Sequence, residues 1–168
     1  MKSALLIPVP GVESLVGAHR LALDPTCALG MPAHITLVTP FAPPPISAQI
    51  IAELARIMRV LPAIALRFEA VGRFPQTVYL KPEPAGELIR LIETIVARYP
   101  QWPPYGGSHP DIVPHLTVAD RQADPVLLDE LAVQLRKRLP VQTLVREAWL
   151  MHQDADDRWR QIAALPFG

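Results

Sequence analysis

Two short stretches of the chain carry residue types whose spacing suits acid–base chemistry. Residues 32–38 and 113–119 are aliphatic runs, each with a His-x-Thr triplet inside it and a proline close upstream. In a β-strand, residues two apart share a face, so His34 and Thr36 point to one side while Ile35 points to the other. The imidazole can move a proton, and the hydroxyl can donate a hydrogen bond to an anion. Two such units facing one another would form an active site.

The second triplet shows the same alternation. His115 and Thr117 share one face of the expected strand, with Leu116 and Val118 behind them. Histidine is the side chain whose ordinary pKa allows one copy to act as a base and another as an acid near neutral pH. If the two strands face a common cleft, the chain has both groups available.

The remaining elements must position these two strands. Hydrophobic periodicity predicts a helix over 12–23 and further helices whose apolar faces run over 50–61, 88–99 and 127–139. Ser47 and Asp124 precede two of these helices as expected N-caps. The predicted strands are 3–9, 33–39, 65–71, 77–81, 113–119, about 141–152 and 159–165, with residues 72–76 as the connection between the third and fourth.

The order of elements repeats. A His-x-Thr strand, a helix and two strands occur over about 33–81 and again over about 113–165, with the two histidines eighty-one positions apart. The two copies share almost no side chains outside the triplets, so the repeat is one of order and spacing. A loop over 100–111, rich in proline and glycine, leads into the second copy, and loops of this length are often functional.

Composition limits the classes of function. The 168 residues fit one domain, and half of them are hydrophobic, which excludes a disordered chain. Lysine plus arginine equals aspartate plus glutamate at 16 each, whereas proteins that bind long nucleic acid usually carry a basic excess. A single cysteine, Cys27, excludes an internal disulfide or a thiolate metal cluster. The first apolar run is too short for a signal peptide or a membrane span, so we expect a cytoplasmic protein.

The paired triplets resemble those of a known superfamily. Residues 33–38 with Pro40 and Phe41, and residues 114–119, are similar to the two His-x-Thr motifs of the 2H phosphoesterases. That superfamily includes the 2′-5′ RNA ligases and the cyclic nucleotide phosphodiesterases. The similarity covers nearly the whole chain, since the predicted strand 77–81 also fits. The motifs are specific as a pair, and outside them the match is one of pattern.

The resemblance implies a fold and an activity. The expected fold is a single bilobal α+β domain over 1–168, in which two antiparallel sheets related by a pseudo-twofold axis flank a cleft, with helices outside. The expected activity is that of a hydrolase opening 2′,3′-cyclic or related phosphodiesters without a metal or cofactor, with possible reversible 2′-5′ RNA ligation. The partner would be a nucleotide or an RNA end bearing a phosphate, with no long nucleic-acid tract, no membrane, and the protein as a monomer.

The resemblance also assigns roles to the four motif residues. His34 and His115 would divide the acid and base roles, and Thr36 and Thr117 would hold phosphoryl oxygens. Opening a cyclic phosphodiester requires a base for water, an acid for the leaving oxygen and donors for the phosphoryl charge. Which histidine takes which role, which ring oxygen leaves, and what the physiological substrate is are not determined by the sequence.

Other side chains are candidates for substrate contact, each with a structural alternative. Tyr79 is a candidate base-stacking platform on strand 77–81. Trp149 could line the cleft or belong to the core. Arg121, just past the second motif, and Arg73 could pair with a phosphate or remain on the surface.

Two loop aromatics and three further histidines complete the set. Trp102 and Tyr105 could cover a nucleobase, or anchor their loop to the core. His19 is expected to be a core or boundary residue, whereas His109 and His152 are expected to be exposed bystanders.

Two readings compete with a metal-independent enzyme. In the first, the cleft binds a nucleotide or RNA end without catalysis, and the intact motifs on both strands argue against it. In the second, the two motif histidines hold a metal. No His-x-x-x-His pair or carboxylate cluster with ligand spacing supports that reading, and hydrolysis that survives a chelator would exclude it.

Overall fold

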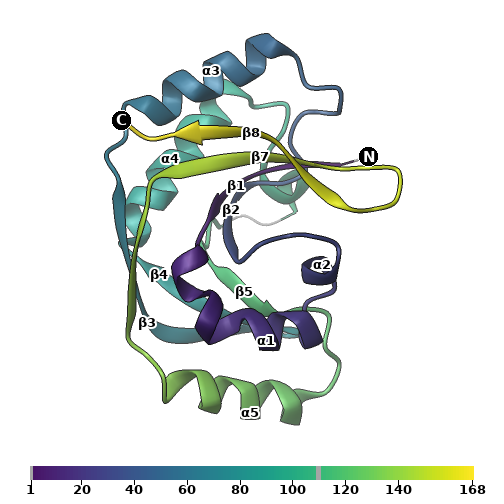
Figure 1. The fold of residues 1–168 in the computed structure, drawn as a ribbon, viewed down its shortest axis with the longest axis vertical. Helices are drawn as coiled ribbons and strands as arrows, with labels where there is room; N and C mark the ends of the chain where they lie inside the picture. The colour runs from purple at the N-terminus through teal and green to yellow at the C-terminus, as the bar shows by residue number, and fades with distance from the viewer. Residues whose placement is uncertain (1, 109–110) are drawn as a thin grey trace.

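The computed structural model, which describes residues 2–108 and 111–168, confirms an α+β fold built on antiparallel strands (Figure 1). The strands are β1 Ser3–Pro8, β2 His34–Val38, β3 Ile64–Phe74, β4 Thr77–Glu83, β5 Leu116–Ala119, β6 Val141–Val145, β7 Glu147–Gln153 and β8 Trp159–Pro166. The α-helices are α1 Glu13–Leu23, α2 Pro25–Ala28, α3 Ala48–Arg59, α4 Ala85–Arg98 and α5 Pro125–Arg136, and two 3₁₀ turns cover Pro10–Val12 and Pro104–Gly107.

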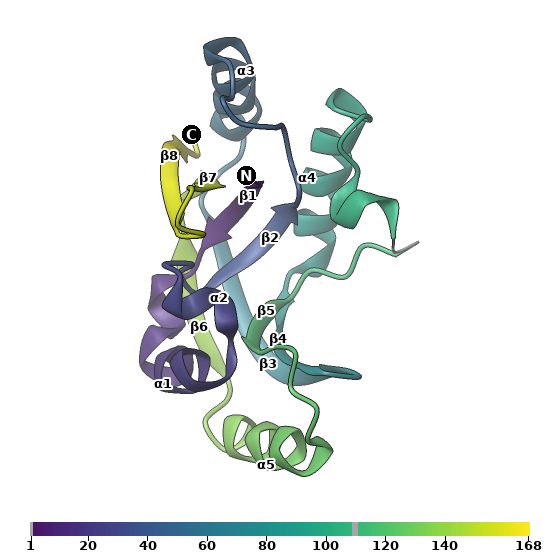
Figure 2. The same ribbon diagram turned by 90° about the vertical axis from the view of Figure 1, so that its right-hand side faces the viewer.

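The sheet consists of two halves rather than two separate sheets. The strand order is β6-β3-β4-β5-β2-β1-β7-β8, so the two motif strands, β5 and β2, meet in the middle (Figure 2). They are joined by a single residue pair, Ile35 opposite Leu116. The two sheets that we expected are therefore halves of one curled sheet, each with a motif strand at its inner edge. The pseudo-twofold relation between the halves stays a prediction.

The chain crosses between the halves twice. After α3, the chain enters β3, which pairs with β4 and β6 in the half that contains the second motif. The prediction of a single strand over 141–152 is wrong. The structure divides this run at Arg146 into two strands: β6 pairs with β3, and β7 pairs with β1. Each half of the sheet therefore takes strands from both sequence repeats. The aliphatic alternation predicted the strands correctly, but alternation does not specify a partner.

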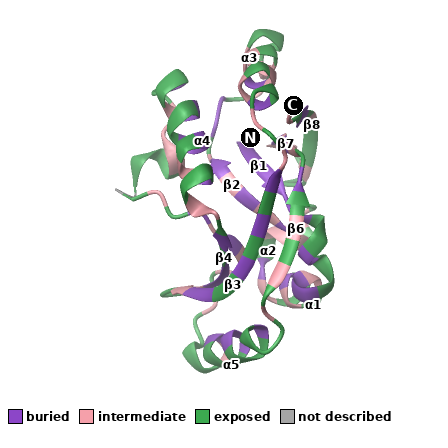
Figure 3. Ribbon diagram, turned by 90° about the vertical axis from the view of Figure 1, so that its left-hand side faces the viewer, coloured by how far each residue is buried: buried purple, intermediate pink, exposed green. Residues whose placement is uncertain are grey.

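The two faces of the motif strands have different surroundings. Ile35, Leu37, Leu116 and Val118 are buried in the main hydrophobic core, as the burial colouring of the sheet illustrates (Figure 3). Helix α4 packs on β2, α1 on β5, α5 on β3 and β4, and α3 on β8. The motif histidines and threonines are half-buried on the other face.

The helix starts follow the predicted capping. The Ser47 hydroxyl accepts a hydrogen bond from the Ile50 amide, and the Asp124 carboxylate accepts from the Val126 amide. These contacts satisfy amides that otherwise lack an intrahelical partner. No helix of the described residues is long and apolar enough to cross a membrane.

A buried ion pair holds the chain just before the first motif. Arg20 on α1 is 1% exposed, and its Nη2 donates to Asp24 Oδ2 at 2.8 Å and to the Met31 carbonyl at 3.2 Å. The other Asp24 oxygen accepts from the amide and hydroxyl of Thr26, at the start of α2. One pair thus ties α1, α2 and the approach to β2 together.

Replacing Asp24 with asparagine should destabilise the fold, because the Arg20 charge would remain buried without a carboxylate. We expect a loss of about 3 kcal/mol in the free energy of unfolding, measured by urea denaturation. The matched control is Asp156→Asn in the exposed β7–β8 turn, which should change stability by less than about 0.5 kcal/mol. Equal effects of the two substitutions would contradict this role for the buried pair.

Candidate active site

The first motif holds its imidazole in one defined tautomer. His34 Nδ1 lies 2.7 Å from the Pro32 carbonyl oxygen, and Nε2 lies 3.1 Å from Thr36 Oγ1. A carbonyl can only accept, so Nδ1 must carry the proton. In the neutral ring Nε2 is then an acceptor, and the Thr36 hydroxyl donates to it. The His34 imidazole therefore has its basic lone pair on Nε2, directed at the Thr36 hydroxyl.

The second motif repeats half of this arrangement. His115 Nδ1 lies 2.6 Å from the Val113 carbonyl oxygen, again two residues earlier in the chain. This contact fixes the same tautomer and directs Nε2 away from the backbone. His115 lies one residue before β5, where we had placed it inside the strand, and its ring orientation comes from this local hydrogen bond.

The single pairing between β2 and β5 brings the two motifs together. Ile35 and Leu116 lie opposite one another and both face the core. The residues on either side of each, His34 with Thr36 and His115 with Thr117, therefore emerge on the other face of neighbouring strands. The charge of His115 is close enough to affect the protonation of His34. The structure thus brings together the four residues that the sequence singled out.

Burial sets the acid–base behaviour of the first motif histidine. Loss of solvent around His34 lowers the pKa of its imidazole from 6.5 to about 4. The charges of Arg20 and His115 lower this pKa further, whereas the Pro32 carbonyl and the Asp24 carboxylate oppose the decrease. His34 is consequently neutral at pH 7 and able to accept a proton.

An aromatic group packs around His115. The Tyr79 ring stacks on Phe74 at 4.5 Å and is tilted against His115 at 5.3 Å, while Phe74 meets His115 edge-on at 5.4 Å. Tyr79 is only 6% exposed, whereas Phe74 is 36% exposed. The exposed ring beside His115 is thus that of Phe74. Stacking of a base on Tyr79 stays a prediction with little exposed ring to support it.

Sequence reasoning missed Phe74 because it placed residues 72–76 in a connection. Strand β3 in fact runs to Phe74 and pairs with Thr77 across a tight turn. Gly72 permits this, because a Cβ atom there would lie 2.2 Å from Tyr79 Cζ. A glycine opposite a tyrosine in a two-strand pattern was the signal that could have revealed the longer strand.

Trp149 lies on the motif side of the sheet. Leu6 on β1 lies opposite both Thr36 and Trp149, so these three residues share a face. Trp149 is half-buried beside a small cluster of Leu6, Met31, Met151 and Trp159, and its Nε1 donates to Glu147 Oε1 at 2.6 Å. It belongs to β7, in the half that carries His34 rather than His115.

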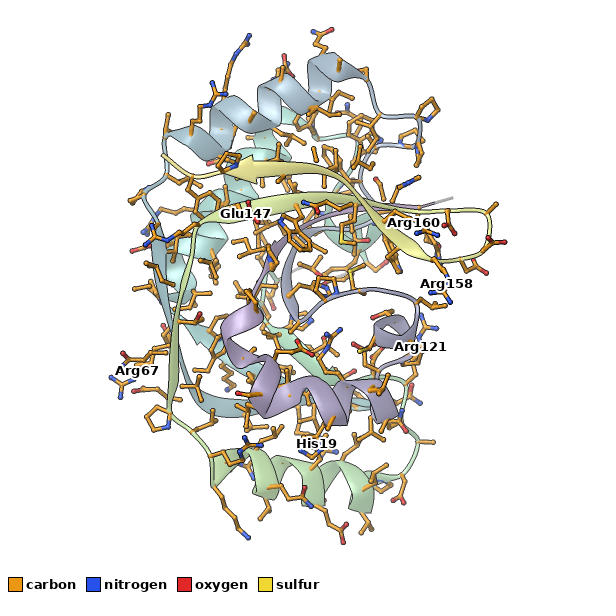
Figure 4. All side chains as sticks on the ribbon, in the orientation of Figure 1. His19, Arg67, Arg121, Glu147, Arg158 and Arg160 are labelled. Carbon is orange, nitrogen blue, oxygen red and sulfur yellow. The ribbon has the colours of Figure 1, made fainter. Side chains whose placement is uncertain are left out.

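The two candidate arginines differ in their surroundings. Arg73 is paired with Asp129 on α5. Arg121 is exposed directly after β5, with a φ of 57° and its Nε 3.5 Å from Asp120. In Figure 4 it lies at the same edge of the molecule as Arg158 and Arg160, opposite Arg67. Contact of Arg121 with a phosphate stays a prediction, whereas the Arg73 guanidinium is already paired with a carboxylate.

The two loop aromatics and the histidines outside the motifs differ in burial and in their contacts. Trp102 anchors the loop, with its ring 5.1 Å from Phe41, whereas Tyr105 is 37% exposed and lines a cavity together with Thr36. His19 is half-buried on α1 (Figure 4), and His152 is half-buried on β7 rather than fully exposed. The prediction for His109 lies outside the described residues. Within residues 2–108 and 111–168, no group of three histidine, cysteine or carboxylate side chains is arranged to hold a metal ion.

Comparison with known proteins places this geometry in a family. The family described as the 2′-5′ RNA ligase superfamily matches residues 8–157. A putative phosphoesterase of Bacillus pumilus is 27% identical over 159 residues, which cover 92% of this chain and 90% of that protein. A second putative phosphoesterase, from Bacillus licheniformis, is 26% identical over 164 residues, which cover 92% of this chain and 91% of that protein.

Solved structures share the fold. TT0787 of Thermus thermophilus has a TM-score of 0.65 at 17% identity, covering 99% of this chain and 97% of its own. E. coli LigT, in its complex with NADP+, has a TM-score of 0.63 at 18% identity. The match covers 99% of this chain and 96% of LigT. At these identities the likeness is one of fold.

The protonation of His34 can be measured directly. Nuclear magnetic resonance of the imidazole nitrogens should give a midpoint at about pH 4 for His34, because burial disfavours the charged ring. A midpoint near 6.5 would contradict the buried site. The unfolded chain binds this proton near pH 6.5, so the contribution of His34 to stability should fall as the pH decreases from 6.5 to 4.

Proposed function

We propose a metal-independent phosphodiesterase activity for this chain, which belongs to the 2′-5′ RNA ligase superfamily. The substrate is a 2′,3′-cyclic phosphate, or a related phosphodiester, at the end of an RNA or on a small nucleotide. The observation that carries the proposal is the pairing of β2 with β5, which puts two His-x-Thr units on one face of neighbouring strands. The phosphoesterase relatives and the nucleotide complexes of LigT support it.

His34 is the proposed base. It is neutral at pH 7 because its pKa is about 4, and its Nδ1 proton is committed to the Pro32 carbonyl. Nε2 is thus the atom that takes a proton from water as the water oxygen attacks phosphorus. In the free protein Nε2 accepts from Thr36.

Substrate binding would release this base. When a phosphoryl oxygen accepts the Thr36 proton, the His34 Nε2 lone pair becomes available to the attacking water. Thr36 therefore switches its single proton from the imidazole to the developing charge on the phosphoryl group, where donors contribute most to the rate.

His115 is the proposed acid. It lies on the neighbouring strand, so it can approach the phosphorus from the side opposite to His34, as an in-line displacement requires. In this role His115 is the imidazolium, with Nδ1–H on the Val113 carbonyl and a second proton on Nε2. As the bond between phosphorus and one ring oxygen breaks, Nε2 gives its proton to that oxygen. Thr117 holds a phosphoryl oxygen on this side, and proton exchange with water restores both histidines. With the 5′-hydroxyl of a second RNA end in place of water, the same groups would form a 2′-5′ bond as the 3′ oxygen leaves and takes the proton from His115.

The charge of the chain favours a small or terminal substrate. The equal numbers of acidic and basic residues argue against binding a long phosphate backbone. LigT has been solved with 3′-AMP and with ATP, which are small nucleotides. Phe74, beside His115, offers an exposed ring for the nucleobase. A cleft that binds such ligands without turnover is the second candidate, and the defined tautomers of both histidines favour the enzyme over it.

Alanine at either histidine should remove most turnover. With nucleoside 2′,3′-cyclic phosphates and EDTA present, we expect His34→Ala and His115→Ala each to reduce kcat by roughly 10²- to 10⁴-fold. His152→Ala, on β7, is the control and should retain activity. Wild-type protein that binds the nucleotide but leaves the ring closed would favour the binding module, and activity abolished by EDTA would contradict the metal-independent scheme.

An activated leaving group should separate the two roles. The p-nitrophenolate of a p-nitrophenyl phosphodiester leaves without being protonated. Such an ester should therefore restore activity to His115→Ala far more than to His34→Ala. The rates of the two variants on the activated and natural esters measure this directly. Restoration of His34→Ala instead would reverse the proposed roles.

A further inference from the structure

A cavity adjoins the first motif on the side of the segment between α4 and β5. Its volume is about 210 Å³, and Thr36 forms part of its wall, whereas the described residues that line it include neither motif histidine. Helix α4 and the 3₁₀ turn Pro104–Gly107, which both contact β2, supply other parts of the wall (Figure 2). The cavity is therefore next to the proposed phosphate site and distinct from it.

The wall of the cavity is mostly apolar. Leu37 and Ile92 form its buried side, at 1% and 2% exposure, whereas Val113 is 45% exposed on its outer side. Pro103 and Pro104 form a further part of the wall, and a proline ring has almost no conformational freedom to lose when a ligand binds. The cavity thus extends from the hydrophobic core to the surface, with walls that cost little entropy to order.

Two contacts hold the segment between α4 and β5 against β2. The ring centroids of Trp102 and Phe41 are 5.1 Å apart, and the Tyr105 amide donates to the Thr39 carbonyl at 2.6 Å. Thr39 and Phe41 lie directly after β2 in the chain. The part of the wall that this segment forms is therefore fixed relative to the strand that carries the first motif.

Size and charge indicate what the cavity can hold. Pockets for drug-sized ligands have volumes of about 300–1,000 Å³, so a cavity of about 210 Å³ takes a smaller group such as a single nucleobase. A base can stack on the Tyr105 ring, which lines the cavity and is 37% exposed.

The charge of the wall disfavours a phosphate in the cavity. The described residues that line it include no lysine or arginine, but they include the carboxylate of Asp111. A phosphate would be repelled by that carboxylate, with no cation in the wall to balance the charge. The amino group of a base can instead donate to a carboxylate. The occupant that fits is therefore the uncharged part of a nucleoside.

The position of the cavity relates it to the attacking oxygen. In the proposed mechanism His34 Nε2 takes the proton of the nucleophile, and this atom lies 3.1 Å from Thr36 Oγ1. Because Thr36 lines the cavity, a nucleoside bound there can present a hydroxyl group to the proposed base. Phe74, the exposed ring beside His115, belongs to β3 in the other half of the sheet. Each half thus offers an apolar position for a base.

We propose that this cavity binds a second nucleoside, whose 5′-hydroxyl replaces water as the nucleophile. The inference rests on the proposed phosphodiesterase function. The 5′ oxygen forms a bond to phosphorus while its proton passes to His34 Nε2. The bond between phosphorus and the 3′ oxygen breaks, and that oxygen takes the proton from His115 Nε2. The product is a 2′-5′ dinucleoside phosphate, and proton exchange with water restores both histidines.

Transfer to a free nucleoside tests the proposal. The protein is incubated, in the presence of EDTA, with adenosine and a nucleoside 2′,3′-cyclic phosphate whose own 5′ position is phosphorylated and so cannot attack. We expect a 2′-5′ dinucleotide beside the hydrolysis product, in an amount that saturates with adenosine. 5′-Deoxyadenosine keeps the base but lacks the nucleophile, so it should give no dinucleotide and should compete with adenosine.

Substitutions in the wall assign the transfer to this cavity. Val96→Phe, on α4, should lower the ratio of dinucleotide to hydrolysis product by roughly tenfold or more, because the added ring takes the space of the base. Ile112→Phe repeats the test from the segment before β5 if Val96→Phe does not fold. Val133→Phe, at an exposed position on α5, is the matched control and should keep the ratio within about twofold of wild type. Wild-type ratios in the cavity variants would overturn the inference.

Binding separates this inference from the proposed function. Protein saturated with a nucleoside 3′-phosphate should bind one further adenosine per chain, because the cavity is distinct from the phosphate site. If the cyclic nucleotide is hydrolysed but adenosine neither binds to this complex nor yields a dinucleotide, the inference alone fails. If no cyclic nucleotide is opened and no nucleoside 3′-phosphate binds, the proposed function fails and the inference fails with it.

Discussion

The site depends on one backbone contact, the pairing of Ile35 with Leu116 at the join between the two halves of the sheet. Both side chains are fully buried, so the hydrophobic core fixes the register of β2 against β5. A slip of one residue would turn an imidazole into that core and an aliphatic side chain to the opposite face of the sheet. The relative placement of the two histidines is consequently set by packing behind the sheet.

The two motif histidines make the same local hydrogen bond but have different surroundings. Each motif histidine donates Nδ1–H to a carbonyl two residues earlier. His34 is half-buried, the loss of solvent around its ring lowers its pKa, and its Nε2 accepts a hydrogen bond from Thr36. His115 instead packs against Tyr79 and Phe74. The two motif histidines thus differ in their tertiary contacts, although their local hydrogen bonds match.

This division explains what the sequence predicts. Alternation and helical periodicity identified most strands, four helices and the caps at Ser47 and Asp124, because these are local properties, and the family resemblance supplied the α+β class. The break at Arg146 was missed because it depends on long-range pairing. Before Arg146 the chain pairs with β3, and after it the chain pairs with β1. Phe74 was missed for a similar reason, because its position beside His115 depends on a contact with a residue far along the chain.

The central claim is that both motifs act on one phosphoryl group. Titration with a nucleoside 3′-phosphate, followed by nuclear magnetic resonance of the Nε2 atoms of His34 and His115, tests it most directly. The account predicts that both signals move together and saturate with a single Kd. A ligand that shifts only one imidazole, or shifts the two with different affinities, would contradict it.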